Sequence, residues 1–277
     1  MIFRARQFEF VFPRPALVMG VVNVTPDSFS DGGKFLDRAA AVAHALELVE
    51  QGADILDIGG ESTRPHAEPV GEAEELRRVI PVIEKLARKI KIPLSIDTMK
   101  PAVAHAALTA GVSVVNDVAA HRGENEIWPV VSGFRAGYIC MHAPPGFHKL
   151  QKQKNMAREA GEFFRERLGK MKAAGISPEQ VVFDPGIGFG KTLEQNLSLL
   201  ADLRSFTKLR RPLLLGVSRK SFIGKLLGAE VDARLPASLA CAILAVEAGV
   251  QIVRTHDVAA TVQAVRMAEA VLARKKP

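Results

Sequence analysis

Cysteine is scarce in this sequence. Only Cys140 and Cys241 occur among its 277 residues, and both lie within apolar stretches. Neither is accompanied by further ligands at the spacing of a zinc site, which excludes a zinc centre built on these two residues. Two isolated cysteines in apolar surroundings are typical of buried, reduced thiols rather than of a disulfide framework.

Long hydrophobic runs are also missing. The longest apolar stretches, such as residues 212–217, are far shorter than the ~20 residues that a membrane-spanning helix needs. The first ten residues include Arg4, Arg6 and Glu9, which interrupt any apolar segment of a secretory signal. We therefore expect a cytoplasmic protein without membrane contacts.

Motifs for nucleic-acid binding, phosphate loops and nucleophilic triads are absent as well. The net charge is +7, but the basic residues are dispersed and accompany no such motif, so we expect no nucleic-acid partner. The glycine cluster at 186–191 lacks P-loop spacing. His256 and Asp257 are adjacent, and adjacent strand residues face opposite ways, so they do not indicate a triad.

The sequence contains instead eight short apolar runs that alternate with longer amphipathic stretches. Continuous apolar runs are typical of parallel strands that are buried on both faces. The expected strands are residues 17–24, 53–58, 93–97, 112–118, 137–141, 181–184, 212–217 and 250–254. The expected helices are residues 37–51, 72–89, 101–110, 155–174, 193–208 and 258–275, and helix ends are expected at Gly52, Gly111, Gly175 and Gly249.

Eight alternating strand and helix units predict an α/β fold, a (β/α)8 TIM barrel that forms a single domain over residues 1–277. The alternative is a doubly wound open sheet. Residues 3–12 alternate between apolar and polar side chains. They predict an N-terminal β-hairpin that closes the bottom of the barrel.

Polar residues follow every expected strand. In a barrel the carboxyl ends of the strands converge on one opening, where active sites lie. Asp97, Asn116 and Asp184 are short polar groups, and they suit a flat heterocycle with N–H and C=O groups at its edge. The turn at 186–191 is expected to let Phe189 lean on the same ligand.

A second group of polar residues suits phosphate. Arg64, Arg254 and His256 carry N–H donors that match phosphate oxygens. Asn23 offers a neutral oxygen to Mg2+, an ion that takes few protein ligands and keeps waters and phosphates. We therefore expect an anionic, phosphate-bearing substrate and a magnesium ion at the rim.

Several stretches of the chain carry recognisable motifs. Residues 23–33 read NVTPDSFSDGG and residues 59–65 read GGESTRP, and both are glycine-containing loops that we expect to close over a substrate. Residues 184–191 read DPGIGFGK, and residues 218–221 read SRKS. Together with Arg254 and His256-Asp257, these motifs resemble those of the dihydropteroate synthases, and the resemblance covers about residues 17–270.

The resemblance implies an enzyme of folate biosynthesis. Dihydropteroate synthases are (β/α)8 barrels that join 4-aminobenzoate to 7,8-dihydropterin-6-ylmethyl diphosphate and release pyrophosphate, so the chain is expected to be a transferase. Mg2+ is the implied cofactor. The implied partners are these two small-molecule substrates and a second copy of the chain in a homodimer.

The resemblance also implies roles for individual residues. Those implied in catalysis are Asn23, Asp97, Lys220, Arg254 and His256, with Asn23 as the metal ligand. Those implied to bind the pterin are Asp97, Asn116, Met141, Asp184 and Lys220, and Gly216 is expected to contribute to substrate binding. Those implied to bind the diphosphate are Thr63, Arg64, Arg254 and His256, and those implied to frame the aminobenzoate are Pro65, Phe189, Ser221 and the first loop.

Two other functions use related residues. A methyltransferase acting on methyltetrahydrofolate would share the pterin-binding acids, but it has no use for the Arg254 and His256 anion group. A non-catalytic pterin- or anion-binding barrel would be expected to lose loop residues such as Asp27 or Arg64, which this chain keeps.

Overall fold

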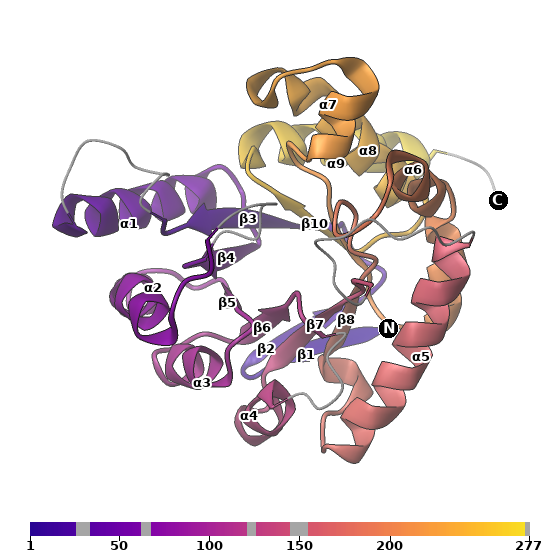
Figure 1. The fold of residues 1–277 in the computed structure, drawn as a ribbon. Helices are drawn as coiled ribbons and strands as arrows, with labels where there is room; N and C mark the ends of the chain where they lie inside the picture. Colours follow the sequence, from indigo (N-terminus) through magenta and orange to yellow (C-terminus); the bar gives the residue numbers. More distant parts are fainter. Residues whose placement is uncertain (26–33, 62–67, 121–125, 145–154, 275–277) are drawn as a thin grey trace.

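The structure is a computed structural model that describes residues 1–25, 34–61, 68–120, 126–144 and 155–274. Eight parallel strands form one sheet that curls into a barrel, with helices around the outside (Figure 1). The strands are β3 (Leu17–Asn23), β4 (Ile55–Gly59), β5 (Leu94–Asp97), β6 (Val114–Asp117), β7 (Gly137–Met141), β8 (Val181–Asp184), β9 (Leu214–Gly216) and β10 (Ile252–Thr255). Their order in the sheet is β8-β7-β6-β5-β4-β3-β10-β9.

The two edge strands of this sheet meet. Phe183 of β8 forms a parallel bridge with Leu213, and its N–H donates to the carbonyl of Pro212 at 2.9 Å. This contact closes the ring between β8 and β9. The (β/α)8 barrel is therefore confirmed and the doubly wound sheet is excluded, and each expected strand lies within two residues of its expected bounds.

The helices cover the outside of the barrel (Figure 1). They are α1 (Lys34–Glu50), α2 (Glu72–Ala87), α3 (Pro101–Thr109), α4 (Ile127–Phe134), α5 (Met156–Ala173), α6 (Leu193–Ala201), α7 (Ser221–Leu227), α8 (Leu235–Glu247) and α9 (Val258–Leu272), with short 3-10 turns η2 (Pro178–Gln180), η3 (Leu203–Leu209) and η4 (Val231–Arg234). The expectation of a single helix over residues 193–208 was wrong, because the chain forms α6 and then η3 there. The carbonyl of Asp202 accepts from Ser205 N at 2.9 Å, an i to i+3 bond that tightens the chain into η3.

The hairpin expected at the N-terminus is present and fills the bottom of the barrel. β1 (Ile2–Ala5) pairs antiparallel with β2 (Phe8–Val11). Phe3 and Phe10 are buried in one apolar cluster with the residues at the start of the barrel strands. Gly137 permits this close packing, because a Cβ at that position would lie 2.7 Å from Cζ of Phe3.

The barrel interior has an apolar lower layer and a polar upper layer. Alternate residues of a strand face the same side. The lower layer is formed by Leu17, Met19, Ile55, Val114, Ile139, Val182, Leu214 and Ile252. Two residues further along five of these strands lie Asp57, Asn116, Asp184, Gly216 and Arg254. The strand register therefore directs these five positions into the barrel, above an apolar floor.

The outer faces of the strands pack against the helices. Val18, Leu56, Ile96 and Val115 belong to a large buried cluster that includes residues of α1, α2 and α3. Asp117 also belongs to this outer side, where Tyr138 Oη donates to its carboxylate at 2.7 Å. None of the helices in the described part of the chain is long and apolar enough to cross a membrane.

Candidate functional site

The centre of the polar layer is an ion-pair network around Arg254 on β10. Nε of Arg254 donates to Oδ2 of Asp57 at 2.7 Å, and Nη2 donates to Oδ2 of Asp97 at 2.9 Å. Asn116 Nδ2 donates to the same Asp57 oxygen at 2.9 Å. Strands β4, β5, β6 and β10 each supply one member, so the network joins half of the barrel strands at the rim.

Burial shapes the charges in this network. Burial raises the pKa of Asp97 to about 7, although the charge of Arg254 opposes this shift. For Arg254, burial lowers the pKa, but the carboxylates of Asp57 and Asp97 outweigh it and hold the pKa above its ordinary value. The guanidinium is therefore fixed in place and charged, whereas Asp97 can change its protonation near neutral pH.

A second group of charges lies between β8 and the loop after β9. Lys220 Nζ donates to the carbonyl of Ile187, and it lies 4.5 Å from the ring centroid of Phe189. Burial lowers the pKa of Lys220 to about 8, against the effect of Asp184. For Asp184, burial raises the pKa, and the charge of Lys220 and the N–H of Gly186 oppose this rise.

An apolar cluster lies at the same end of the barrel. Val118, Met141 and Ala143 are buried together, and Phe189 and Met99 pack against them. Met141 and Asp184 are paired in register on β7 and β8. The site thus combines a flat apolar surface with carboxylate, amide and ammonium groups at its edge.

Gly216 leaves room beside these groups. A Cβ on this residue would lie 3.8 Å from Cβ of Arg254 and 3.9 Å from Nζ of Lys220. The residue is therefore located between the two cations of the site, where it adds no side chain of its own.

Asn23 ends β3 on the side of the site nearest Asp97. A Cβ on Gly59, its partner in the register, would lie 3.7 Å from Asn23 Oδ1 and 3.7 Å from Cβ of Asp97. No group of three or more His, Cys, Asp or Glu residues among the described residues could hold a metal. Asn23 offers one neutral side-chain oxygen, and Mg2+ favours sites with few protein ligands that water and phosphate oxygens complete.

His256 and Ser221 lie at the outer edge of the site. His256 Nδ1 is 3.1 Å from Oγ of Ser218, and the backbone N–H of His256 donates to the same oxygen at 3.2 Å. Ser221 is exposed and begins α7. An ion pair between Arg219 and Asp257 joins the loops that carry these residues.

Some expected site residues lie outside the described residues. These are Thr63, Arg64, Pro65 and the first loop from Pro26 to Gly33. The other expected residues, on β3, β5 to β10 and the loops after β8 and β9, come together at the carboxyl end of the barrel.

Sequence reasoning missed two central residues. Asp57 was not among the expected site residues, although it pairs with both Arg254 and Asn116. Lys191 is 4% exposed and donates to three backbone carbonyls. The spacing of Ile55 and Asp57 places both on one face of their strand, but the strand alone does not show that this face lines the barrel. Nothing in the sequence indicated the contacts of Lys191.

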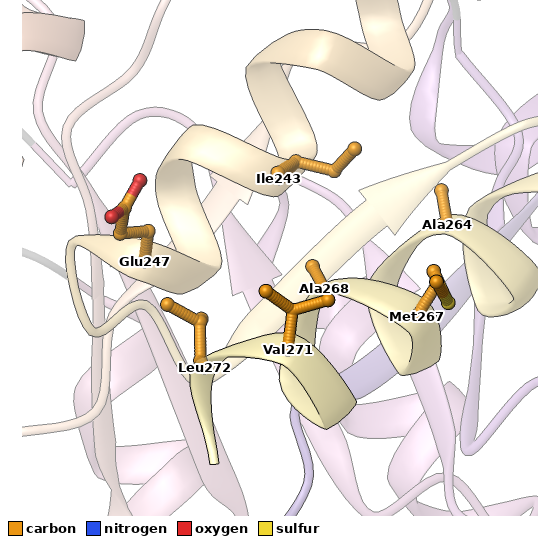
Figure 2. Close-up of a pocket in the computed structure, with 7 residues that line it drawn as sticks. All are labelled: Ile243, Glu247, Ala264, Met267, Ala268, Val271 and Leu272. Carbon is orange, nitrogen blue, oxygen red and sulfur yellow. The ribbon is translucent and has the colours of Figure 1, made fainter. Parts of the chain in front are cut away.

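A groove on the outside of the barrel is separate from this site. Figure 2 shows it between α8 and α9, and it has a volume of about 350 Å3. It is lined by Ile243, Glu247, Ala264, Met267, Ala268, Val271 and Leu272. Apolar side chains dominate this lining, in contrast to the charged rim.

Known proteins share both the sequence and the fold. The family model for pterin binding enzymes matches residues 19–256. The dihydropteroate synthase of Escherichia coli (strain K12) is 43% identical over 264 residues, which cover 94% of this chain and 93% of that protein. A Xanthomonas albilineans dihydropteroate synthase structure with 4-aminobenzoic acid has a TM-score of 0.92 and 45% identity, covering 99% of both chains. A structure of the same enzyme with 7,8-dihydropteroate has a TM-score of 0.90 and 43% identity, covering 99% of this chain and 100% of that one.

The family match identifies this closed parallel barrel, with buried carboxylates and an apolar cluster at its carboxyl end, as a pterin-binding enzyme. The similarity extends over nearly the whole chain at more than 40% identity. The chain belongs to the dihydropteroate synthases, which are transferases of folate biosynthesis.

Proposed function

We propose that this chain condenses 7,8-dihydropterin-6-ylmethyl diphosphate with 4-aminobenzoate to give 7,8-dihydropteroate and pyrophosphate. The observation that carries this proposal is the network in which Arg254 bonds to Asp57 and Asp97, and Asn116 bonds to Asp57. It places several acceptors and donors within one buried layer, as a flat heterocycle with mixed edge groups requires.

The pterin lies deep in the barrel in this proposal. Asp97, Asn116 and Asp184 bind its N–H and C=O groups, and Lys220 adds an ammonium donor. Met141 and Phe189 pack on its rings, because they belong to the apolar cluster at this end. Gly216 borders the pterin with backbone alone.

The diphosphate lies above the pterin, towards the rim. Arg254 and His256 approach it from β10, and Thr63 and Arg64 of the second loop complete the set of donors. Arg254 has five N–H groups, and two of its nitrogens bond to carboxylates. We infer that it connects the pterin pocket to the anion site rather than serving phosphate alone.

Magnesium fits this arrangement through Asn23. A bound Mg2+ would neutralise charge on the leaving pyrophosphate. The chain itself contributes the side-chain oxygen of Asn23, which would help to hold the ion, the guanidinium of Arg254 and the imidazole of His256. The donors of Arg254 and His256 stabilise the negative charge that develops as the C–O bond breaks.

The aminobenzoate occupies the outer part of the site. Ser221, Pro65 and Phe189 frame it there, together with the first loop. Its aromatic amine is neutral at pH 7, so the attack on the pterin methylene needs no strong base. Rate enhancement then comes mainly from holding the amine and the methylene in contact.

The proposal is tested with the purified full chain by measuring pyrophosphate release from the pterin diphosphate, with and without 4-aminobenzoate. We expect release that depends on the amine and yields dihydropteroate in equal amounts. Release at the same rate without the amine, or none with it, would contradict the assignment.

We also propose that the chain forms a homodimer through the α8 and α9 surface. Large apolar side chains are exposed there, among them Leu244 at 59%, Met267 at 66% and Val271 at 53%. The groove in Figure 2 lies in the same surface. Exposed apolar patches of this kind are typical of protein interfaces. Sedimentation of wild type and of M267E tests this, since a charge in the interface should give monomers.

The chain is proposed to act in the cytoplasm. Cys140 and Cys241 are both free thiols, and burial raises the pKa of each, which keeps them protonated. Free thiols fit a reducing compartment. Location of the tagged full chain in cell fractions tests this.

A further inference from the structure

Lys191 is almost fully buried at the end of the loop that follows β8. It is 4% exposed. Its ammonium donates to the carbonyls of His142 at 3.0 Å, Gly186 at 2.8 Å and Phe189 at 3.2 Å. An ammonium has three N–H donors, so these three carbonyls use all of them.

Each of these carbonyls belongs to a segment that carries a residue of the pterin pocket. His142 directly follows Met141 at the end of β7. Gly186 donates its N–H to Oδ1 of Asp184 at 2.7 Å. Phe189 lies against Lys220 and the apolar cluster. The ammonium therefore connects the backbone positions of the acidic, apolar and aromatic parts of the pocket.

The backbones are packed tightly around the ammonium. Gly186 has a φ of +66°, and a Cβ on it would lie 2.0 Å from the carbonyl oxygen of His142. The N–H of Phe189 donates to Gly186 O at 3.2 Å. Three carbonyl dipoles that point at one place repel each other, and a shared cation offsets this repulsion. The loop geometry thus depends on the charge as well as on the donors of Lys191.

A neutral residue fixes the same loop from the other side. Asn196 of α6 accepts from Gly188 N at 2.7 Å and donates to the carbonyl of Thr192 at 2.8 Å. Asn196 therefore anchors the loop to the outer helix layer. Lys191 anchors it to the segment after β7, which is the side that faces the pocket.

The charged groups around Lys191 come from three elements. Burial lowers the pKa of Lys191 to about 7, while Asp184 and Glu159 raise it and Lys220 lowers it further. Asp184 ends β8, Glu159 belongs to α5 and Lys220 precedes α7. The ammonium is thus in electrostatic contact with both ionisable groups that are proposed to bind the pterin at this side.

We propose that Lys191 is a positioning residue for the pterin. By binding the carbonyls of residues 142, 186 and 189, it holds Met141, Asp184 and Phe189 in one preformed arrangement before the substrate arrives. This inference rests on the proposed pterin-binding role of Asp184. A preformed site raises affinity, because less conformational entropy is lost when the ligand binds.

The test compares K191M with K191Q, and with K170M as the matched control. Lys170 is an exposed lysine on α5 that pairs with Glu166. K191M should weaken binding of an unreactive pterin by at least about tenfold, which corresponds to 1.4 kcal/mol. K191Q should lose less, because its amide keeps two N–H donors, and K170M should stay within about twofold of wild type.

Kinetics separate positioning from a general role in stability. K191M should raise KM for the pterin diphosphate more than KM for 4-aminobenzoate, because among the three held segments only that of Phe189 is also proposed to border the amine. Folding is checked by circular dichroism and thermal unfolding. Equal pterin affinity in folded K191M and wild type overturns the inference. Equal increases in KM for both substrates also overturn it.

A measurement on wild type covers the case in which K191M does not fold. Hydrogen exchange of the Gly186 and Phe189 amides should be slow without ligand and should change little when a pterin is added. Fast exchange that becomes slow only with the pterin overturns the preformed arrangement. If wild type binds no pterin at all, the proposed function itself fails, which distinguishes that result from failure of the Lys191 inference alone.

Discussion

Arg254 and Asp57 are 197 residues apart in the chain, yet Nε of Arg254 lies 2.7 Å from Oδ2 of the fully buried Asp57. Their strands, β10 and β4, are not neighbours in the sheet, because β3 lies between them. The ion pair therefore spans the inner face of the barrel across one strand. It fixes the guanidinium at the level of Asp97, the last residue of β5, and of Asn116, the last residue but one of β6.

This relationship predicts a large stability cost for D57A. Removing one partner leaves Arg254 buried with Asp97 alone, and broken buried pairs cost about 3–5 kcal/mol. We expect the free energy of unfolding, measured by urea titration, to fall by this amount in D57A. The pair of Arg158 and Glu162, 2.9 Å apart, supplies the control. Both side chains are exposed, so E162Q should unfold at nearly the same urea concentration as wild type. Equal effects of the two substitutions would show that Asp57 is not a buried anchor.

Asp184→Asn should weaken pterin binding. The carboxylate is buried, accepts from Gly186 N and faces the charges of Lys220 and Lys191. Loss of a hydrogen bond to a charged group costs about 1.5–3 kcal/mol, which calorimetry with an unreactive pterin can measure. D232N, in the exposed η4 turn, should bind as wild type does. Unchanged affinity in D184N would remove Asp184 from the site.

Pterin binding should have a bell-shaped pH dependence. Burial raises the pKa of Asp97 to about 7, so its accepting carboxylate forms as the pH rises through 7. Burial lowers the pKa of Lys220 to about 8, so its donating ammonium is lost above that pH. Burial also lowers the pKa of Lys191 to about 7, so loss of its ammonium adds to the fall in affinity on the alkaline side. Affinity should therefore peak near pH 7, and D97N should remove the acid side of the profile alone. An unaltered acid side in D97N would rule Asp97 out.

The raised pKa of Asp97 also determines how the stability of the fold changes with pH. The pKa of Asp97 is raised above its value in the unfolded chain, so the folded state binds a proton that the unfolded state has released. The contribution of Asp97 is therefore fully present below about pH 4 and is lost as the pH rises through about 7. The free energy of unfolding of D97N minus that of wild type should therefore grow between about pH 4 and about pH 7. A constant difference would contradict the shift.

Removal of divalent metal should stop turnover. EDTA should abolish pyrophosphate release, and added Mg2+ should restore it. N23A should need more Mg2+ for half-maximal activity, since it removes the side-chain oxygen proposed to bind the ion. Full activity in the presence of EDTA would overturn the magnesium site.

Lys100→Met should destabilise the base of the second loop. Lys100 forms ion pairs with Glu61 and with the fully buried Glu75, whose Oε1 has no hydrogen-bond partner. K100M leaves the buried Glu75 carboxylate without an opposite charge. We therefore expect the free energy of unfolding to fall by about 3–5 kcal/mol. The double variant with E75Q should recover much of it in the same unfolding experiment. No recovery would mean that Glu75 does not depend on Lys100.

The sequence predicted the strands well because parallel barrel strands are buried on both faces and read as continuous apolar runs. It could not tell which polar residues at the strand ends face inward. Asp97 and Asn116 face the site, whereas Asp117 bonds to Tyr138 on the outer side. That difference depends on register, which is a property of neighbouring strands rather than of one segment.

The helices were less predictable for a local reason. α4 and α7 have eight and seven residues, which is too short for a helical period to stand out. The division of α6 from η3 depends on a single backbone bond at Asp202. Likewise, the contacts of Lys191 are all to backbone carbonyls, which side-chain patterns do not reveal.

The hairpin beneath the barrel also bears on the order of events in the proposed reaction. Phe3 and Phe10 pack into the lower end of the barrel, so under the proposed function substrates and products would pass through the rim at the other end. A pterin held by the deepest groups would then enter before the amine covers it, and the condensed product would leave before the next pterin binds. A hairpin far from the chemistry would thereby impose a sequence on binding and release.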